Sequence, residues 1–263
     1  MRSIIPSKRS VWSQIAIAAG SAAAIVVATN LSRPYYVARE PLGAQLLAHK
    51  YVEPADVRVP WMHSPAEVAL KTPQFLLDRE LFAMDLLRTG YVNQTRARAL
   101  ADIAVREAYT RRIPPALVLG VMLTENDELK SSARSSVGAV GLMQVNARPW
   151  HTLARKFGTN VHTDSTNLKY GIYILGWITR RSAKAVDDRD DAWRNALLGY
   201  NGCVTGKNTH DCHSYPDVVR RQVQSAAKST CPGADFNRCV VEPMWAAHRD
   251  STAIIDSLNG PGR

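Results

Sequence analysis

The amino-acid sequence predicts a mainly α-helical protein, and three observations support that prediction. Apolar residues recur at helical spacing in several segments. Proline and polar capping residues stand where those segments begin. No segment of useful length alternates apolar and polar residues as a half-buried strand does. Because the chain has 263 residues and no repeats or low-complexity tracts, we expect one substantial core with extensions.

The N-terminus predicts an export segment. Arg2, Lys8 and Arg9 precede an uncharged run over residues 10–32 that is rich in alanine. The run approaches the roughly 20 residues that span a bilayer, whereas a cleavable signal has a shorter apolar core and a clearer small-x-small exit. The pattern therefore favours an uncleaved membrane anchor over a signal peptide, and either one exports everything after Arg33.

The next segments predict a linker and two helices. Residues 34–63 contain four prolines and no sustained period, as a linker or a loosely docked arm does. Over residues 64–88 a helical pattern begins with a serine cap and a proline at the first helical position, and Pro73 forces a break or a kink. A second helix is expected over residues 93–112.

The segment over residues 114–124 predicts a buried helix that delivers Glu125 to the rim of the core. It is apolar nearly all round, so its last turn is not in open water. Desolvation raises the pKa of a carboxyl group, and so does the negative end of a helix dipole. A glutamic acid that is protonated near neutral pH can protonate a glycosidic oxygen. Glu125 is therefore the candidate acid, and Glu128 is the competing one.

A glycine-rich loop and three further helices are expected after Glu125. The loop covers residues 135–144, and its glycines allow the backbone to approach a ligand closely. The helical segments that follow it are 150–157, 166–181 and 190–200.

Four blocks of this chain stand in an order that a known family shares. They are Leu117 to Glu125, Ser135 to Gln144, Asn167 with Gly171, and Leu198 to Gly202. Together they resemble the catalytic domain of the soluble lytic transglycosylases, a branch of the lysozyme-like (goose-type) superfamily. The chain departs from the family at Asn126, where a serine is usual, and in a stretch between Glu125 and Gly138 that is one residue longer. Val145-Asn146 after the second block resembles the smaller transglycosylases of type IV secretion, conjugation and pilus systems.

The resemblance implies a mechanism with a single acid. Glu125 would protonate the oxygen between muramic acid and glucosamine, while the acetamido group of the substrate steadies the positive charge. The same glutamate would then take the proton of the sugar's primary hydroxyl, which attacks the anomeric carbon and leaves an anhydro-muramyl end. The second carboxylate that ordinary glycosidases use is not evident in the sequence. A hydrolytic muramidase and a non-catalytic wall-binding assembly protein stay open as alternatives.

The resemblance also implies the other residues of the site. Tyr200 is the second candidate catalytic residue. It is expected beside the acid, because a half-buried tyrosine hydroxyl needs a partner and a carboxyl group is a suitable one. We read Asn167 as a structural cap. Met143 is expected mainly to pack, and Asn201 to fix the turn after its helix. The candidate substrate-binding residues are Ser135, Gly138, Gly141, Met143, Gln144 and Asn201.

The cysteines of the chain all follow the Tyr200-Asn201 motif. They are Cys203, Cys212, Cys231 and Cys239. An even number in an exported chain suggests disulfides, for which three connectivities are possible. Local pairing, Cys203 with Cys212 and Cys231 with Cys239, closes short loops and is favoured. Zinc is the rival, since His210 and His213 stand beside Cys212, but the spacing matches no common Cys/His finger. We therefore expect no metal and no cofactor.

Composition limits the partners. Lys+Arg number 33 against 23 Asp+Glu, and the formal charge of +10 favours anionic partners. Nucleic acid is discounted because no basic motif is interleaved with aromatic residues. We expect peptidoglycan glycan strands, the inner membrane and a secretion, conjugation or pilus machine, all met on the periplasmic side. The predicted organisation is 1–33 cytoplasmic tip and anchor or signal, 34–92 linker and helical extension, 93–225 catalytic domain and 226–263 extension with a cysteine pair.

Overall fold

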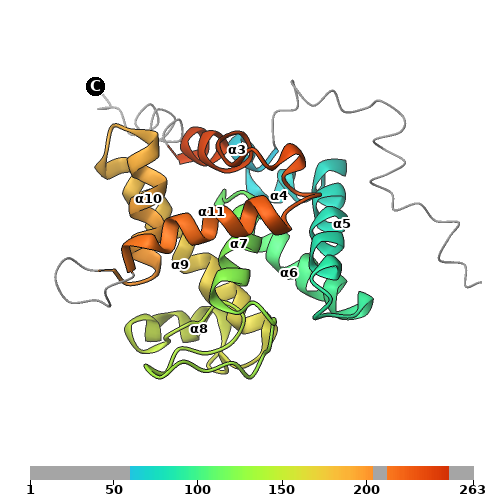
Figure 1. Cartoon of the computed structure of the whole chain (residues 1–263), viewed down its shortest axis with the longest axis vertical. Helices are drawn as coiled ribbons and strands as arrows, with labels where there is room; N and C mark the ends of the chain where they lie inside the picture. The colour runs from blue at the N-terminus through green and yellow to red at the C-terminus, as the bar shows by residue number, and fades with distance from the viewer. Residues whose placement is uncertain (1–59, 204–211, 249–263) are drawn as a thin grey trace, which may run out of the picture.

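The computed structural model of the chain describes residues 60–203 and 212–248 (Figure 1). The predicted anchor over residues 10–32, most of the predicted linker and His210 lie outside the described residues. Among the helices of the described ranges, none is both long enough and apolar enough to cross a bilayer.

The described residues are mainly helical, as the sequence predicts. The longer helices pack around a common core in Figure 1. Within the described residues the only β pairing is two isolated bridges in the glycine-rich loop, at Val140. The α-helices are α3 (Pro60–His63), α4 (Ala66–Ala69), α5 (Pro73–Arg88), α6 (Gln94–Arg111), α7 (Pro115–Glu125), α8 (Ala154–Phe157), α9 (Asp164–Ala185), α10 (Arg189–Tyr200) and α11 (Tyr215–Ala226). Short 3₁₀ or π turns are η1 (Arg148–Leu153), η2 (Cys212–Ser214), η3 (Pro232–Ala234) and η4 (Asn237–Val241).

Capping side chains set the starts of α5, α6, α9 and α10. The Thr72 side chain accepts a hydrogen bond from the Phe75 amide, and Pro73 occupies the first position of α5. The predicted interruption at Pro73 is therefore a break between α4 and α5. Asn93 caps α6 and Thr163 caps α9 in the same way. The cap at Thr163 starts α9 before the expected boundary.

Helix α11 is the main element that the sequence reading did not predict. Its buried apolar side chains recur every four residues, at Tyr215, Val219 and Val223, and the rest of the helix is mostly polar. That spacing is the signal of a helix with one narrow apolar stripe. The stripe packs against α7, where Gly120 allows a close approach. A Cβ atom at Gly120 would lie 2.4 Å from the Val223 Cγ2 atom.

Helix α7 lies at the centre of the core, and α11 crosses it in Figure 1. Every residue of α7 from Pro115 to Leu123 is buried. Helix α6 packs between α5 and α9, and α9 packs in turn on α10. The sequence of α7 is apolar nearly all round because α5, α6 and α11 pack against it.

Both flanks of the predicted catalytic domain contribute to the same core. Trp61 and Phe82 come from the N-terminal flank, and Val240 and Met244 from the C-terminal flank. The division into extensions and a catalytic domain stays a prediction. In the described residues, however, the flanking segments pack as part of one hydrophobic cluster.

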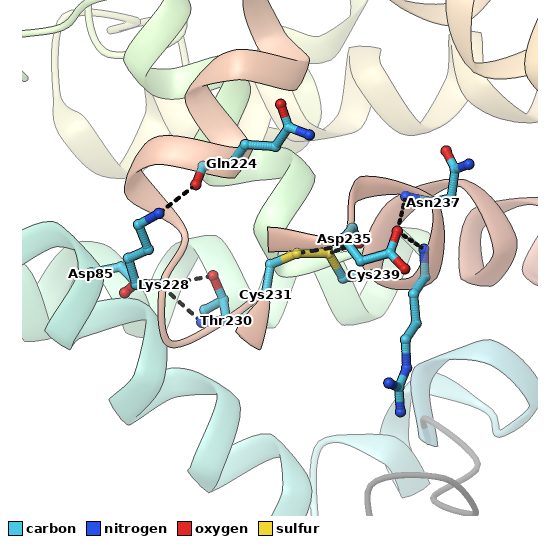
Figure 2. Close-up of a disulfide and its surroundings, with 9 residues drawn as sticks. Asp85, Gln224, Lys228, Thr230, Cys231, Asp235, Asn237 and Cys239 are labelled. Carbon is cyan, nitrogen blue, oxygen red and sulfur yellow. Dashed lines mark hydrogen bonds between the residues drawn. A yellow bond between two sulfur atoms is a disulfide. The ribbon is translucent and has the colours of Figure 1, made fainter. Parts of the chain in front are cut away.

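A buried carboxylate joins the two flanks. Asp85 on α5 is fully buried and accepts hydrogen bonds from the backbone amides of Ser229 and Thr230, each at 2.8 Å. The Thr230 hydroxyl donates a further bond, which Figure 2 shows beside the Cys231–Cys239 disulfide. Because a buried charge needs hydrogen-bonding partners, the turn at residues 229–230 is fixed against α5.

Candidate active site

Glu125 is the last residue of α7 and lies partly buried at the rim of the core. Burial raises the pKa of its carboxyl group to about 7. The helix ends immediately afterwards, since Asn126 is the C-cap with non-helical backbone angles, and its amide donates to the Met122 carbonyl. The sequence-based expectation of a carboxylate at the edge of a buried helix agrees with this geometry.

Tyr215, at the start of α11, is the direct partner of Glu125. Its hydroxyl donates a hydrogen bond to Glu125 Oε1 at 2.5 Å, and 8% of the residue is exposed. This bond favours the charged carboxylate and lowers the pKa of Glu125, but the effect of burial is larger. Sequence reasoning missed Tyr215 because it missed α11, and the four-residue apolar spacing that starts at this tyrosine could have indicated both.

Tyr200 lies near the same carboxyl group but bonds elsewhere. Its hydroxyl donates to the Met143 carbonyl at 3.0 Å. Burial, and then the charge of Glu125, raise the pKa of Tyr200 well above its ordinary range. Tyr200 therefore connects α10 to the glycine-rich loop, and its hydroxyl lies close enough to Glu125 to be affected by the charge of that carboxyl group. Its catalytic role stays a prediction.

The competing acid is in a different environment. Glu128 is exposed and forms an ion pair with Lys130, and Asp127 is also exposed. Among these three neighbouring carboxyl groups, only Glu125 is partly buried and bonded to a tyrosine. The geometry therefore favours Glu125 as the group that can hold a proton near neutral pH.

Asn167, on α9, fixes the glycine-rich loop by hydrogen bonds to its backbone. Its side-chain amide donates to the carbonyls of Val140 and Val161, and its oxygen accepts from the Met143 amide at 2.9 Å. Gly141 has φ of +78° and lies so close that a Cβ atom would be 2.4 Å from Asn167 Nδ2. Only glycine fits this left-handed, crowded position. Asn167 is thus a buried structural residue, as predicted, but it is not a helix cap, because Thr163 is the N-cap of α9.

Asn126 adds a second anchor to the loop. This residue stands where the family usually has serine, and it is buried. Its side chain donates to the carbonyls of Lys130 and Gly141 and accepts from the Lys130 amide. The departure from the family pattern therefore fixes the backbone that follows the acid.

The predicted substrate-binding residues divide by exposure. Met143 is fully buried and packs on Gly171, where a Cβ atom would lie 2.5 Å from its sulfur atom. Gly141 is buried too, whereas Ser135 and Gln144 are partly exposed and Gly138 and Asn201 are exposed. Their contacts with substrate stay predictions.

Local hydrogen bonds occupy two of these polar side chains. Ser135 Oγ accepts from the Ala139 amide, and Gln144 Nε2 donates to the Gly141 carbonyl. Gln144 keeps its amide oxygen as an acceptor, and its backbone has φ of +43°. Ser135 and Gln144 therefore stabilise the loop and are also partly exposed to solvent. Asn201 follows α10 as its C-cap, which agrees with a role in the turn.

Both disulfides form as the favoured local pairing predicts. Cys203 bonds to Cys212 and Cys231 bonds to Cys239. His213 offers a nitrogen within 4.8 Å of the Cys203 and Cys212 sulfur atoms. Those sulfur atoms are bonded to each other, so they are not thiolates that could bind zinc.

One family model matches this chain. The model described as "Transglycosylase SLT domain" covers residues 102–211, less than half of the chain. No curated protein and no solved structure matches. The matched range contains Glu125, the glycine-rich loop and Tyr200, and it stops four residues before Tyr215. Residues 102–211 therefore form a transglycosylase SLT domain, and the enzyme activity that this domain carries is that of a lytic transglycosylase.

Proposed function

We propose that this enzyme cleaves the MurNAc-GlcNAc bond of peptidoglycan without water and leaves anhydro-muramyl ends. The single observation that best supports this is the environment of Glu125, whose carboxyl group has a pKa of about 7 and bonds to Tyr215. A group with that pKa populates both protonation states near neutral pH, so it can serve as acid and then as base.

The reaction needs one proton to leave Glu125 and one to return. Protonated Glu125 gives its proton to the bridging oxygen, and the bond between that oxygen and the anomeric carbon breaks. The acetamido oxygen of the muramic acid stabilises the positive charge that develops at its anomeric carbon. The primary hydroxyl of that sugar then attacks the anomeric carbon, and its proton goes to the Glu125 carboxylate. Glu125 ends protonated again, and no water is consumed.

Burial rather than a neighbouring carboxylate accounts for the raised pKa of Glu125. A hydrolase of the ordinary two-carboxylate type would use a second carboxyl group to activate water or attack the sugar. In the described residues the two nearest acidic neighbours in sequence are exposed, and one of them is paired with lysine. This favours the intramolecular route over a muramidase.

The products of a peptidoglycan digest test the proposal. Full-length enzyme acting on purified wall is expected to release muropeptides with anhydro ends, each lighter by one water than a reducing end, and mass spectrometry separates the two. Predominantly reducing ends would instead identify a muramidase. Wall binding with no release would identify a non-catalytic assembly protein. A Glu125→Gln protein is the blank for the release measurement.

We also propose that the enzyme acts on the periplasmic side of the inner membrane, where it opens the wall for a secretion, conjugation or pilus machine. The uncharged run over residues 10–32 and the Gln144-Val145-Asn146 sequence support this proposal. Fractionation of cells that produce the full chain, with and without residues 1–33, tests the location. Full-length protein recovered only from the soluble fraction would refute the anchor.

A further inference from the structure

The Cys203–Cys212 disulfide lies between the two helices that carry the tyrosines of the site. Helix α10 ends at Tyr200 and α11 begins at Tyr215. Cys203 follows the first tyrosine by three residues and Cys212 precedes the second by three. The disulfide brings their Cα atoms to 5.6 Å. The end of α10 and the start of α11 are therefore joined by a short covalent path.

The hydrogen bond between Tyr215 and Glu125 tolerates little movement of α11. The hydrogen bond from Tyr215 to Glu125 is 2.5 Å long, and a shift of about 1 Å would lengthen it beyond hydrogen-bonding range. Cys212 is almost fully buried and is the first residue of η2, the turn that ends directly before Tyr215. Any displacement of Cys212 thus passes directly to the first turn of α11.

The noncovalent contacts with neighbouring helices differ between the middle of α11 and its first turn. Val219 and Val223 fix the middle of the helix against α7. The first turn is linked to α10 by Arg194 and Asp217, a bidentate ion pair at 2.9 and 3.2 Å whose side chains are about two-fifths exposed. Exposed ion pairs contribute little to stability. The disulfide is the stronger link at the end of α11 where Tyr215 lies.

We propose that the Cys203–Cys212 disulfide is a positioning element of the active site, which holds the Tyr215 hydroxyl against Glu125. The proposal rests on the function proposed above and goes beyond the family match, which names no disulfide and ends before Cys212. The disulfide does not touch substrate. It acts through Tyr215, so its loss impairs turnover more than it impairs folding.

The second disulfide provides a matched control. Cys231–Cys239 closes a similar loop, with a sequence separation of 8 against 9 and the same Cα–Cα distance. It lies beside Asp235, which accepts from the Asn237 amide, and beside the turn at Thr230 (Figure 2). None of these contacts involves Glu125. Its removal reports what losing a short disulfide costs in stability alone.

The experiment compares two double variants of the full-length enzyme, C203S/C212S and C231S/C239S. We expect the first to lose about tenfold or more in kcat on peptidoglycan and the second to stay within about twofold, once both are assayed well below their melting temperatures. Equal losses in the two variants would overturn the proposal. If C203S/C212S does not fold, C203A/C212V is used, since it fills the buried Cys212 position.

A double-mutant cycle tests whether the disulfide acts through Tyr215. In a Tyr215→Phe background, removal of Cys203–Cys212 is expected to reduce kcat by less than about twofold further. A full additional tenfold loss would show that the disulfide acts by another route and would overturn the assignment.

A titration without turnover separates this proposal from the proposed function. The carboxyl carbon of Glu125, followed by NMR against pH, is expected to titrate at a shifted pH in C203S/C212S, in the same direction as in Tyr215→Phe. In C231S/C239S the midpoint should match the wild type. An unchanged midpoint in C203S/C212S would overturn the positioning role even if the wild-type enzyme released no muropeptides.

Discussion

Glu125 is expected to account for most of the catalysis. The Glu125→Gln variant keeps the shape and removes the titrating proton, so activity should fall by about a hundredfold or more. Glu128→Gln is the matched control, because Glu128 is exposed and paired with Lys130, and it should retain near-normal activity. Turnover of labelled wall measures both, with circular dichroism to check folding. Normal clearing by folded Glu125→Gln would remove Glu125 from the mechanism.

The protonation of Glu125 also predicts how stability depends on pH. Its pKa is about 7 in the folded protein against an ordinary 4.5, so the folded state binds more protons than the unfolded state between these values. The contribution of Glu125 to stability therefore falls as pH rises from about 4.5 to 7. Relative to the wild type, Glu125→Gln should melt at progressively higher temperature over that window. A melting difference that is constant with pH would contradict the raised pKa.

Tyr215 is expected to tune this acid. Its hydrogen bond favours the carboxylate, so Tyr215→Phe should raise the pKa of Glu125 and move the alkaline limb of the pH–activity profile upward. Loss of the oriented bond should lower kcat by about tenfold. Tyr200→Phe removes a bond to Met143 rather than to Glu125. The alkaline limb of its pH–activity profile should therefore lie at the same pH as in the wild type. A shift in Tyr200→Phe alone would reverse the two assignments.

Among the elements, the glycine-rich loop should be sensitive at Gly141 in particular. A Gly141→Ala side chain would meet Asn167 at 2.4 Å in a left-handed backbone conformation, whereas Gly138 has φ of +87° with nothing within 4 Å. Backbone strain alone costs about 1–3 kcal/mol. Gly138→Ala should therefore lose stability by about that amount, and Gly141→Ala by clearly more. Thermal unfolding of the two variants measures the difference, and equal losses would mean that Asn167 yields easily.

Sequence reasoning succeeded where one residue type determines the local structure. The apolar run predicted α7, Pro73 predicted the interruption that separates α4 from α5, and the spacing of the cysteines favoured the observed pairing. It failed where the determinant is a tertiary contact. Helix α11 is mostly polar and needs α7 to bury its stripe. Tyr215 meets Glu125 only once that helix is docked, at a separation of 90 residues.

For the whole molecule, net charge predicts how the enzyme meets its polymer. The formal charge of +10 should attract an anionic wall. Added salt screens such attraction over roughly 10 Å at 0.1 M. Binding of inactive Glu125→Gln protein to purified wall should therefore weaken steeply as salt is raised, as a pelleting assay would measure. Binding that is indifferent to salt would show that uncharged contacts, rather than net charge, hold the enzyme on its polymer.

The buried carboxylate of Asp85 has a consequence for where this protein can be cut. A fragment of residues 93–225 would keep the acid and both tyrosines but would lose Asp85 on one side and the turn at residues 229–230 on the other. A fragment of residues 60–225 would remove three donors to that carboxylate, at a cost of roughly 3 kcal/mol. Such a loss is a large part of the 5–15 kcal/mol that typically stabilises a domain.

Residues 60–248 should therefore melt cooperatively, whereas both shorter fragments should be insoluble or unfold at much lower temperature. The family match at residues 102–211 is shorter still: it begins inside α6 and excludes all of α11. We therefore expect the smallest unit that folds to be larger than the unit that the family model recognises. A gene fragment trimmed to residues 102–211 would encode Glu125 without α11, which packs against the helix that carries it.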